Sequence, residues 1–179
     1  MDDTFLIKKK ICLLGSFAVG KTSLVERFVY NRFDEKYLTT IGVRVSQKIL
    51  PPIRNPKSGE RTQYNLLIWD IERIEKLDSV VRNYYRGAAG ALAVADVTRP
   101  ETISTLQEIV DTFRSVTPEA QLLIVGNKLD IFEQDKKTLA LLKKTASHFS
   151  TEYFLSSAKT GGQVEEVFMM LAEKLDLNK

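Results

Sequence analysis

The chain has 179 residues, a length that suits one domain able to bury about 70% of the surface its unfolded form exposes. Its 44% hydrophobic and 27% charged residues are ordinary for a soluble globular protein. The net charge of +3 is small and no basic stripe with interleaved aromatic residues occurs, which argues against a nucleic-acid-binding protein.

Apolar runs of strand length alternate with amphipathic helical stretches, a pattern that predicts an α/β fold with a mostly parallel sheet. The predicted strands cover residues 8–14, 43–50, 64–70, 91–96, 121–127 and 153–155. The predicted helices cover residues 21–32, 100–117, 135–149 and 162–177. Residues 71–90 are rich in charged residues and show no clear hydrophobic periodicity, so we predict no helix or strand there. No repeat or linker interrupts the chain, and we expect residues 1–179 to form a single domain.

The segment 51–61 (PPIRNPKSGER) is polar and contains three prolines, which is typical of a turn or loop. It favours an extended hairpin over a site, and a surface for a protein partner is the alternative. We interpret the basic run at residues 8–10 as a solvated strand start rather than as a contact with acidic lipid or a protein partner.

Targeting and redox signals are sparse. Cys12 is the single cysteine, which excludes an intramolecular disulfide and suits a reducing compartment. No run approaches eighteen apolar residues, the N-terminal segment lacks a signal-peptide core, and the last residues hold no cysteine for a prenyl group. We therefore expect a monomeric, cytoplasmic protein, with membrane association only through a lipidated tail outside this sequence.

Residues 15–22 (GSFAVGKT) match the phosphate-binding pattern G-x-x-x-x-G-K-[ST] between a predicted strand and a predicted helix. Backbone N–H groups and a helix N-terminus converge on one anion only in this order, which argues against an ordinary glycine-containing turn. Gly15 and Gly20 permit the tight wrap, Lys21 reaches the β- and γ-phosphates, and the hydroxyl of Thr22 is a ligand for Mg²⁺. The predicted nucleotide-binding residues of this stretch are Gly15, Ser16, Phe17, Ala18, Val19, Gly20, Lys21, Thr22 and Ser23.

Three more polar segments follow predicted strands: Asp70, residues 127–130 (NKLD) and residues 156–159 (SSAK). Ligands of open α/β sheets bind at the carboxyl ends of the strands, so these segments should meet the phosphate loop. The carboxylate of Asp130 matches the N1–H and exocyclic amine of guanine, whereas adenine would leave it poorly paired at a cost of several kcal/mol, to order of magnitude. This argues against an adenine-nucleotide enzyme. Taken alone, NKLD is also compatible with a simple loop in which Asp130 caps a turn.

The other residues of these segments complete the predicted base site. Asn127 is suited to bridge the base and the phosphate loop, the stem of Lys128 to lie along the base face, and the N–H of Ala158 to donate to the guanine carbonyl. Ser157 and Lys159 flank that N–H and are predicted to contact the nucleotide as well.

These motifs, together with Phe33, TTIG at 39–42, WD at 69–70, YYRGA at 84–88 and DVT at 96–98, resemble those of the Ras superfamily of small GTPases, and the Rab branch in particular. The resemblance implies a single P-loop GTPase domain with a six-stranded sheet and five helices, which cycles between GTP and GDP with Mg²⁺. It implies that Thr40 closes on Mg²⁺ and the γ-phosphate, that Phe33 packs edge-on against guanine, and that Asp70 holds Mg²⁺ through a water. Effectors and regulators would then bind the switch segments 33–42 and 70–86.

The chain departs from the family where D-x-x-G-Q is expected after the third strand. Arg73 stands at the glycine position and Ile74 at the glutamine position, and Phe17 replaces a small residue in the phosphate loop. An isoleucine cannot orient the attacking water, so intrinsic hydrolysis should be slow or depend on a partner protein. The alternatives are a rewired site, with Arg73 catalytic and Glu72 or Glu75 placing the water, or a binding module that does not hydrolyse GTP. A further alternative is that Arg73 and Glu75 are solvated, salt-bridged loop charges, in which case neither takes part in catalysis.

Overall fold

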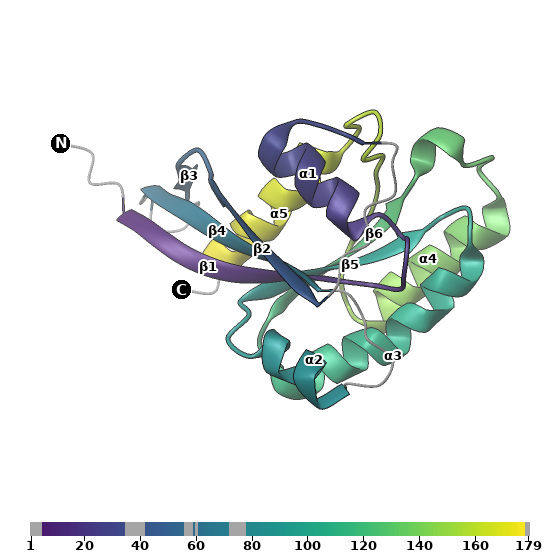
Figure 1. Cartoon of the computed structure of the whole chain (residues 1–179), viewed down its shortest axis with the longest axis horizontal. Coiled ribbons are helices and arrows are strands. Elements are labelled where there is room, and N and C mark those ends of the chain that lie inside the picture. Colours follow the sequence, from purple (N-terminus) through teal and green to yellow (C-terminus); the bar gives the residue numbers. More distant parts are fainter. Residues whose placement is uncertain (1–4, 35–41, 56–58, 60, 72–77, 178–179) are drawn as a thin grey trace.

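A computed structural model of the chain describes residues 5–34, 42–55, 59, 61–71 and 78–177. One sheet runs through the molecule in the order β2-β4-β1-β5-β6-β7, and the short β3 pairs with β4 (Figure 1). The strands are β1 (Phe5–Leu14), β2 (Val43–Ile49), β3 (Ile53–Arg54), β4 (Arg61–Ile71), β5 (Gly90–Asp96), β6 (Gln121–Asn127) and β7 (Tyr153–Leu155). The helices are α1 (Lys21–Tyr30), α2 (Asp78–Tyr85), α3 (Pro100–Val116), α4 (Lys136–His148) and α5 (Val164–Leu177), with a 3₁₀ turn η1 (Leu129–Ile131).

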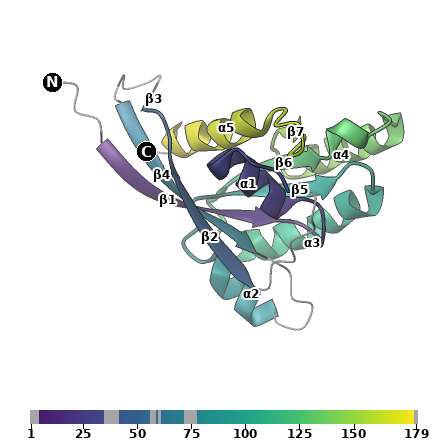
Figure 2. The ribbon, with the colours of Figure 1, turned by 45° about the horizontal axis from the view of Figure 1, so that its top comes forward.

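The helices cover the sheet from both sides. Helices α1 and α5 lie on one face, and α2, α3 and α4 lie on the other (Figures 1 and 2). Each face has its own buried apolar cluster, because the central strands are apolar on both sides. Phe28 of α1 stacks on Phe168 of α5 with ring centroids 3.9 Å apart, which joins the two helices of the first face.

The α/β class with a mostly parallel sheet is confirmed. The pairs β1–β4, β1–β5, β5–β6 and β6–β7 are parallel, and the antiparallel pairs among the described residues are β2–β4 and β3–β4. The six predicted strands form the continuous path of the sheet, and five α-helices lie in the described part of the chain. The observed bounds differ from the predicted ones by up to three residues at element ends, as for β1, which begins at Phe5 instead of residue 8.

The segment 51–61 extends the β2–β4 hairpin, as predicted, but it is not wholly loop, because Ile53 and Arg54 form β3 and Arg61 begins β4. One helix was not predicted. Residues 78–85 form helix α2 inside a stretch that received no element. The helix is short, and among its described side chains, 80–85, Val81 and Tyr85 are the buried ones, which left too little periodicity to recognise.

The parallel strands bring their carboxyl ends to one edge. Strand β1 lies between β4 and β5, so the chain order reverses beside it, which is where ligands of such sheets bind. The register places Leu13 of β1 opposite Asp70 of β4, and Asp96 of β5 opposite Asn127 of β6. The polar residues that end these strands therefore surround the loop that follows β1.

Candidate functional site

The loop between β1 and α1 requires glycine at two positions. Gly15 and Gly20 have φ values of 141° and 97°, which other residues rarely adopt. A Cβ on Gly15 would lie 2.2 Å from the carbonyl oxygen of Val94, and one on Gly20 would lie 2.2 Å from Nδ2 of Asn127. The neighbouring strands β5 and β6 thus press against this backbone and hold its curvature.

Lys21 begins helix α1 and is buried, with 3% of its surface exposed. Its Nζ donates hydrogen bonds to the carbonyl oxygens of Gly15 and Ser16, each at 2.9 Å. The loop therefore wraps around a buried ammonium group. Gly20, the N-cap residue of α1, has no side chain to cap the helix, so the positive end of α1 adds to that charge. A buried cation beside a helix start whose N-cap is glycine is an anion-binding arrangement.

Thr22 and Asp70 lie side by side beneath this loop. The hydroxyl of Thr22 donates to Oδ2 of Asp70 at 2.5 Å, and Asp70 is buried at the end of β4. A hydroxyl and a carboxylate are the hard oxygen donors that Mg²⁺ prefers. These two residues therefore fit a magnesium ion. Thr40, the third predicted ligand, lies outside the described residues.

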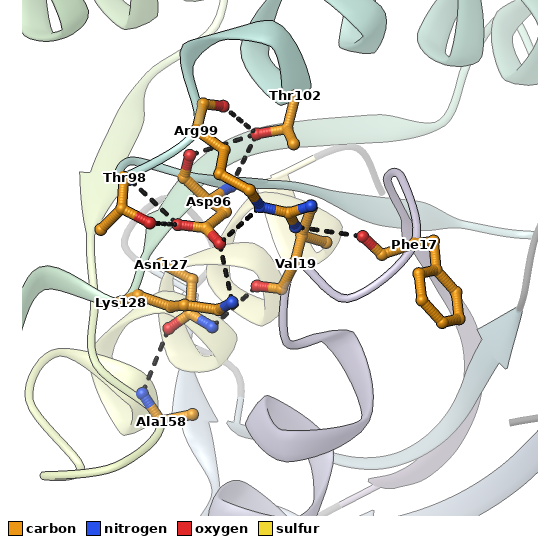
Figure 3. Close-up of polar contacts among 9 residues, drawn as sticks. All are labelled: Phe17, Val19, Asp96, Thr98, Arg99, Thr102, Asn127, Lys128 and Ala158. Atoms are coloured by element: carbon orange, nitrogen blue, oxygen red, sulfur yellow. Dashed lines mark hydrogen bonds and ion pairs between the residues drawn. The ribbon is translucent and has the colours of Figure 1, made fainter. Parts of the chain in front are cut away.

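Asn127 connects three loops. It ends β6 and is 1% exposed. Its Nδ2 donates to the carbonyl oxygen of Val19 at 3.0 Å, and its Oδ1 accepts from the N–H of Ala158 at 3.1 Å (Figure 3). The hydroxyl of Ser156 also donates to Oδ1, at 3.4 Å. The phosphate loop and the two segments predicted to recognise the base are thus one hydrogen-bonded unit.

Asp130 lies in η1 with an exposed side chain, and its Oδ1 accepts from the hydroxyl of Ser157 at 2.6 Å. Arg27 of α1 donates from Nε to the carbonyl oxygen of Ala158 at 2.9 Å and from Nη2 to that of Lys159 at 2.6 Å. Hydrogen bonds therefore connect the segment after β7 to α1, and Asp130 to that segment. Arg27 was not among the predicted site residues.

Asp96 is a second carboxylate at the site that sequence reasoning left without a role. It ends β5 and is 1% exposed. Its Oδ2 accepts from Nζ of Lys128 at 2.7 Å and from Nε of Arg99 at 2.9 Å. Its Oδ1 accepts from the N–H and hydroxyl of Thr98 at 2.9 and 2.6 Å (Figure 3). The signal was available, because Asp96 ends a buried strand on a carboxylate just as Asp70 does.

The pKa of Asp96 reflects these contacts. Burial by itself raises the pKa of this carboxyl, but the hydrogen bonds from Lys128, Thr98 and Arg99 outweigh burial and hold it below its ordinary value. The carboxylate is therefore charged at neutral pH and holds two cations at the edge of the site.

The remaining predicted site residues differ in how far they are buried, and some lie outside the described part of the chain. Ser16, Ala18 and Ser23 are half-buried in and after the loop. The side chain of Phe17 is 54% exposed, and Phe33 is half-buried against the apolar cluster on the α1 and α5 face. Thr40, Arg73 and Ile74 lie outside the described residues, so their predicted roles stay predictions.

Comparisons with a family model and with known proteins point to the same family. The model of the Ras family matches residues 10–177. GTP-binding protein ypt5 of Schizosaccharomyces pombe is 35% identical over 176 residues, covering 96% of this chain and 79% of that protein. Ras-related protein Rab-4B of Homo sapiens is 33% identical over 180 residues, covering 100% of this chain and 81% of that protein. Ras-related protein RabC of Dictyostelium discoideum is 32% identical over 168 residues, covering 93% and 83% respectively.

None of the helices in the described part of the chain combines the length and the apolar character needed to cross a membrane.

Proposed function

The chain belongs to the Ras family, and from that premise we propose that the loops joined by Asn127 form its guanine-nucleotide site. As a Rab-like member it is a GTP-binding molecular switch with GTPase activity. The observation that carries the proposed site is the pair of bonds from Asn127 to Val19 and Ala158, because they join the phosphate loop to both base-recognition segments.

In the proposed site the phosphates occupy the loop 15–22, where Lys21 and the loop amides supply positive charge. The carboxylate of Asp130 accepts from the N1–H and exocyclic amine of guanine. The N–H of Ala158, which donates to Oδ1 of Asn127 in the structure, is shared with the guanine carbonyl in the proposed complex. Ser157 supports this geometry through its hydrogen bond to Asp130. Two donors meeting one carboxylate explain selection against adenine.

Magnesium is the proposed cofactor. Thr22 and Asp70 would hold it, together with Thr40 as the family resemblance implies. When bound, the ion neutralises charge that develops on the phosphates during hydrolysis. The residues of this chain position the nucleotide by backbone amides, the ammonium of Lys21 and the hydroxyl of Thr22.

Hydrolysis of GTP to GDP and phosphate is proposed to be slow without a partner protein. Ile74 offers no hydrogen bond for the attacking water, and the exposed ring of Phe17 stands in the phosphate loop. Catalysis by Arg73 is the alternative route. Family membership favours a hydrolysing switch over a binding module without turnover.

Family members bind effectors in general, and the switch segments 33–42 and 70–86 are the proposed contact region here. In the described part of that neighbourhood, Val45 of β2 is 50% exposed and pairs with Trp69 of β4. An exposed apolar side chain beside a half-buried tryptophan supports a protein-binding surface. The monomeric state and cytoplasmic location stay predictions from the sequence.

The decisive experiment measures nucleotide content and turnover together. The purified chain should retain GDP or GTP, and excess GTP, but not excess ATP, should displace a fluorescent GDP analogue. Phosphate release in a single turnover then reports the hydrolysis rate. Equal displacement by ATP would contradict the guanine site.

A further inference from the structure

Arg99 is held in a fixed position at the start of helix α3. Its N–H donates to the carbonyl oxygen of Asp96 at 2.9 Å, and its own carbonyl oxygen accepts from the hydroxyl of Thr102 at 2.7 Å. The backbone N–H of Thr102 donates to the same carbonyl oxygen at 2.9 Å. The side chain of Arg99 therefore extends from a backbone fixed on both sides.

The guanidinium of Arg99 contacts two different parts of the site. Nε donates to Oδ2 of Asp96 at 2.9 Å, and Nη2 donates to the carbonyl oxygen of Phe17 at 3.1 Å (Figure 3). A planar guanidinium can make both bonds at once because its donors have a fixed geometry, whereas a lysine ammonium is a point charge on a flexible stem. Arg99 thus bridges the end of β5 and the phosphate loop.

The carbonyl oxygen of Phe17 matters because of the peptide to which it belongs. The C=O of Phe17 and the N–H of Ala18 share one planar trans peptide and point in opposite directions. Ala18 has a φ of 59°, a conformation that is uncommon for a residue with a side chain. Fixing the Phe17 oxygen outward therefore fixes the Ala18 N–H, one of the amides available to a bound phosphate.

Asp96 extends this link to the base-recognition segment. The same Oδ2 that accepts from Arg99 also accepts from Lys128, which follows Asn127 in the chain. Two routes thus join the NKLD segment to the phosphate loop. One is the direct bond from Asn127 to Val19, and the other runs from Lys128 through Asp96 and Arg99 to Phe17.

We propose that Arg99 is a positioning residue that, through Asp96, couples the base-recognition segment to the phosphate loop and so slows nucleotide release. This inference rests on the proposed function, because it assigns a role in the same guanine-nucleotide site. Arg99 does not contact the nucleotide in this proposal. It acts by holding the peptide between Phe17 and Ala18.

The test compares Arg99→Lys with Arg114→Lys. Arg114 lies in α3, the helix that begins just after Arg99, and its Nη2 donates to the carbonyl oxygen of Phe149 at 3.0 Å, on a different loop, so it controls for the same chemical change. Arg99→Lys should release a fluorescent GDP analogue faster by on the order of tenfold, the value of one charge-assisted hydrogen bond. Arg114→Lys should release it at the wild-type rate.

Hydrogen exchange separates positioning from a general loss of structure. In GDP-bound Arg99→Lys, amides 16–20 should exchange faster while those of β1, β5 and α5 keep wild-type protection. Wild-type release by Arg99→Lys would overturn the inference, since the charge alone would then suffice. Faster exchange throughout the molecule would overturn it too, because Arg99 would be a stabilising residue only.

A double-mutant cycle tests the coupling through Asp96. If Asp96 transmits between the two side chains, the release rate of the Lys128→Met and Arg99→Lys double variant should differ from the product of the single effects by more than about twofold. Independent effects would contradict the coupling. Failure of the wild-type chain to bind any guanine nucleotide would instead contradict the proposed function, and the inference with it.

Discussion

The hydroxyl of Thr22 donates to Oδ2 of Asp70 at 2.5 Å across 48 residues of sequence. This contact joins the start of α1 to the end of β4, so two oxygen donors meet beside the phosphate loop. It links the loop to the strand that leads into the segment 70–86.

Removing the hydroxyl of Thr22 should weaken the effect of magnesium on nucleotide retention. We expect Thr22→Ala to release GDP faster by about tenfold or more in millimolar Mg²⁺, because one oxygen ligand is lost. Chelating Mg²⁺ should then accelerate release less than it does in the wild-type chain. Thr22→Ser keeps the hydroxyl and should behave as wild type. An equal response of all three proteins to chelation would contradict the assignment of Thr22.

Gly20 offers a test of the contact between the phosphate loop and Asn127. In Gly20→Ala the added Cβ would lie 2.2 Å from Nδ2 of Asn127, so the phosphate loop or this side chain must shift, which disturbs the hydrogen bond from Asn127 to Val19. We expect loss of tight GDP binding, measured by nucleotide content and release rate. Gly87→Ala is the matched control, because Gly87 also has a positive φ, 72°, but nothing lies within 4 Å of its Cβ position. The control should lose about 1 kcal/mol of stability from backbone strain and keep its nucleotide.

Much of this site could be predicted because its residues follow strands. Ligands of open α/β sheets bind at the carboxyl ends of the parallel strands. This rule predicted that four segments that follow strands lie together: GSFAVGKT, Asp70, NKLD and SSAK. The contact between Asn127 and Val19 joins residues 108 positions apart, and the guanine motif anticipated it.

The parts that were missed depend on tertiary contacts without local pattern. Helix α2 is short, and its buried pair Val81 and Tyr85 is only one turn apart. Asp96 and Arg99 gain their roles from Lys128 and Phe17, which are distant in sequence. An arginine before a helix is ordinarily read as a solvated charge, and only the fold shows the carbonyl oxygen that it contacts.

Asp130 should determine the choice of base. In Asp130→Asn a carboxylate acceptor is replaced by an amide that donates on one side, so the exocyclic amine of guanine loses its acceptor while the C2 carbonyl of xanthine gains a donor. We expect a change in preference from GDP towards xanthosine diphosphate on the order of 100-fold, measured by competition against a fluorescent analogue. Unchanged GDP affinity would remove Asp130 from base recognition.

Position 74 should limit the rate of hydrolysis. Ile74→Gln restores a side chain that can orient the attacking water, and single-turnover phosphate release should rise several-fold to about tenfold. Arg73→Ala is the companion variant, because only a catalytic Arg73 predicts slower release of phosphate. If Ile74→Gln gives no gain, the rate is limited elsewhere, with Arg73 and Phe17 as the remaining departures in sequence.

Asp96 should make folding stability depend on pH in the acidic range. Hydrogen bonds from Lys128, Thr98 and Arg99 hold its pKa in the folded state below the unfolded value of about 3.9. A carboxyl whose pKa falls on folding stabilises the fold above the unfolded pKa. That contribution is lost as the pH drops below about 3.9 and through the folded value.

The unfolding midpoint in urea of the wild-type chain should therefore exceed that of Asp96→Asn at pH 7, and the difference should shrink as the pH falls from 5 towards 3. Both proteins carry the same other carboxyl groups, so the difference isolates this one side chain. A difference that stayed constant over that range would mean that Asp96 contributes through shape and neutral hydrogen bonds, not through the charge that holds Arg99 and Lys128.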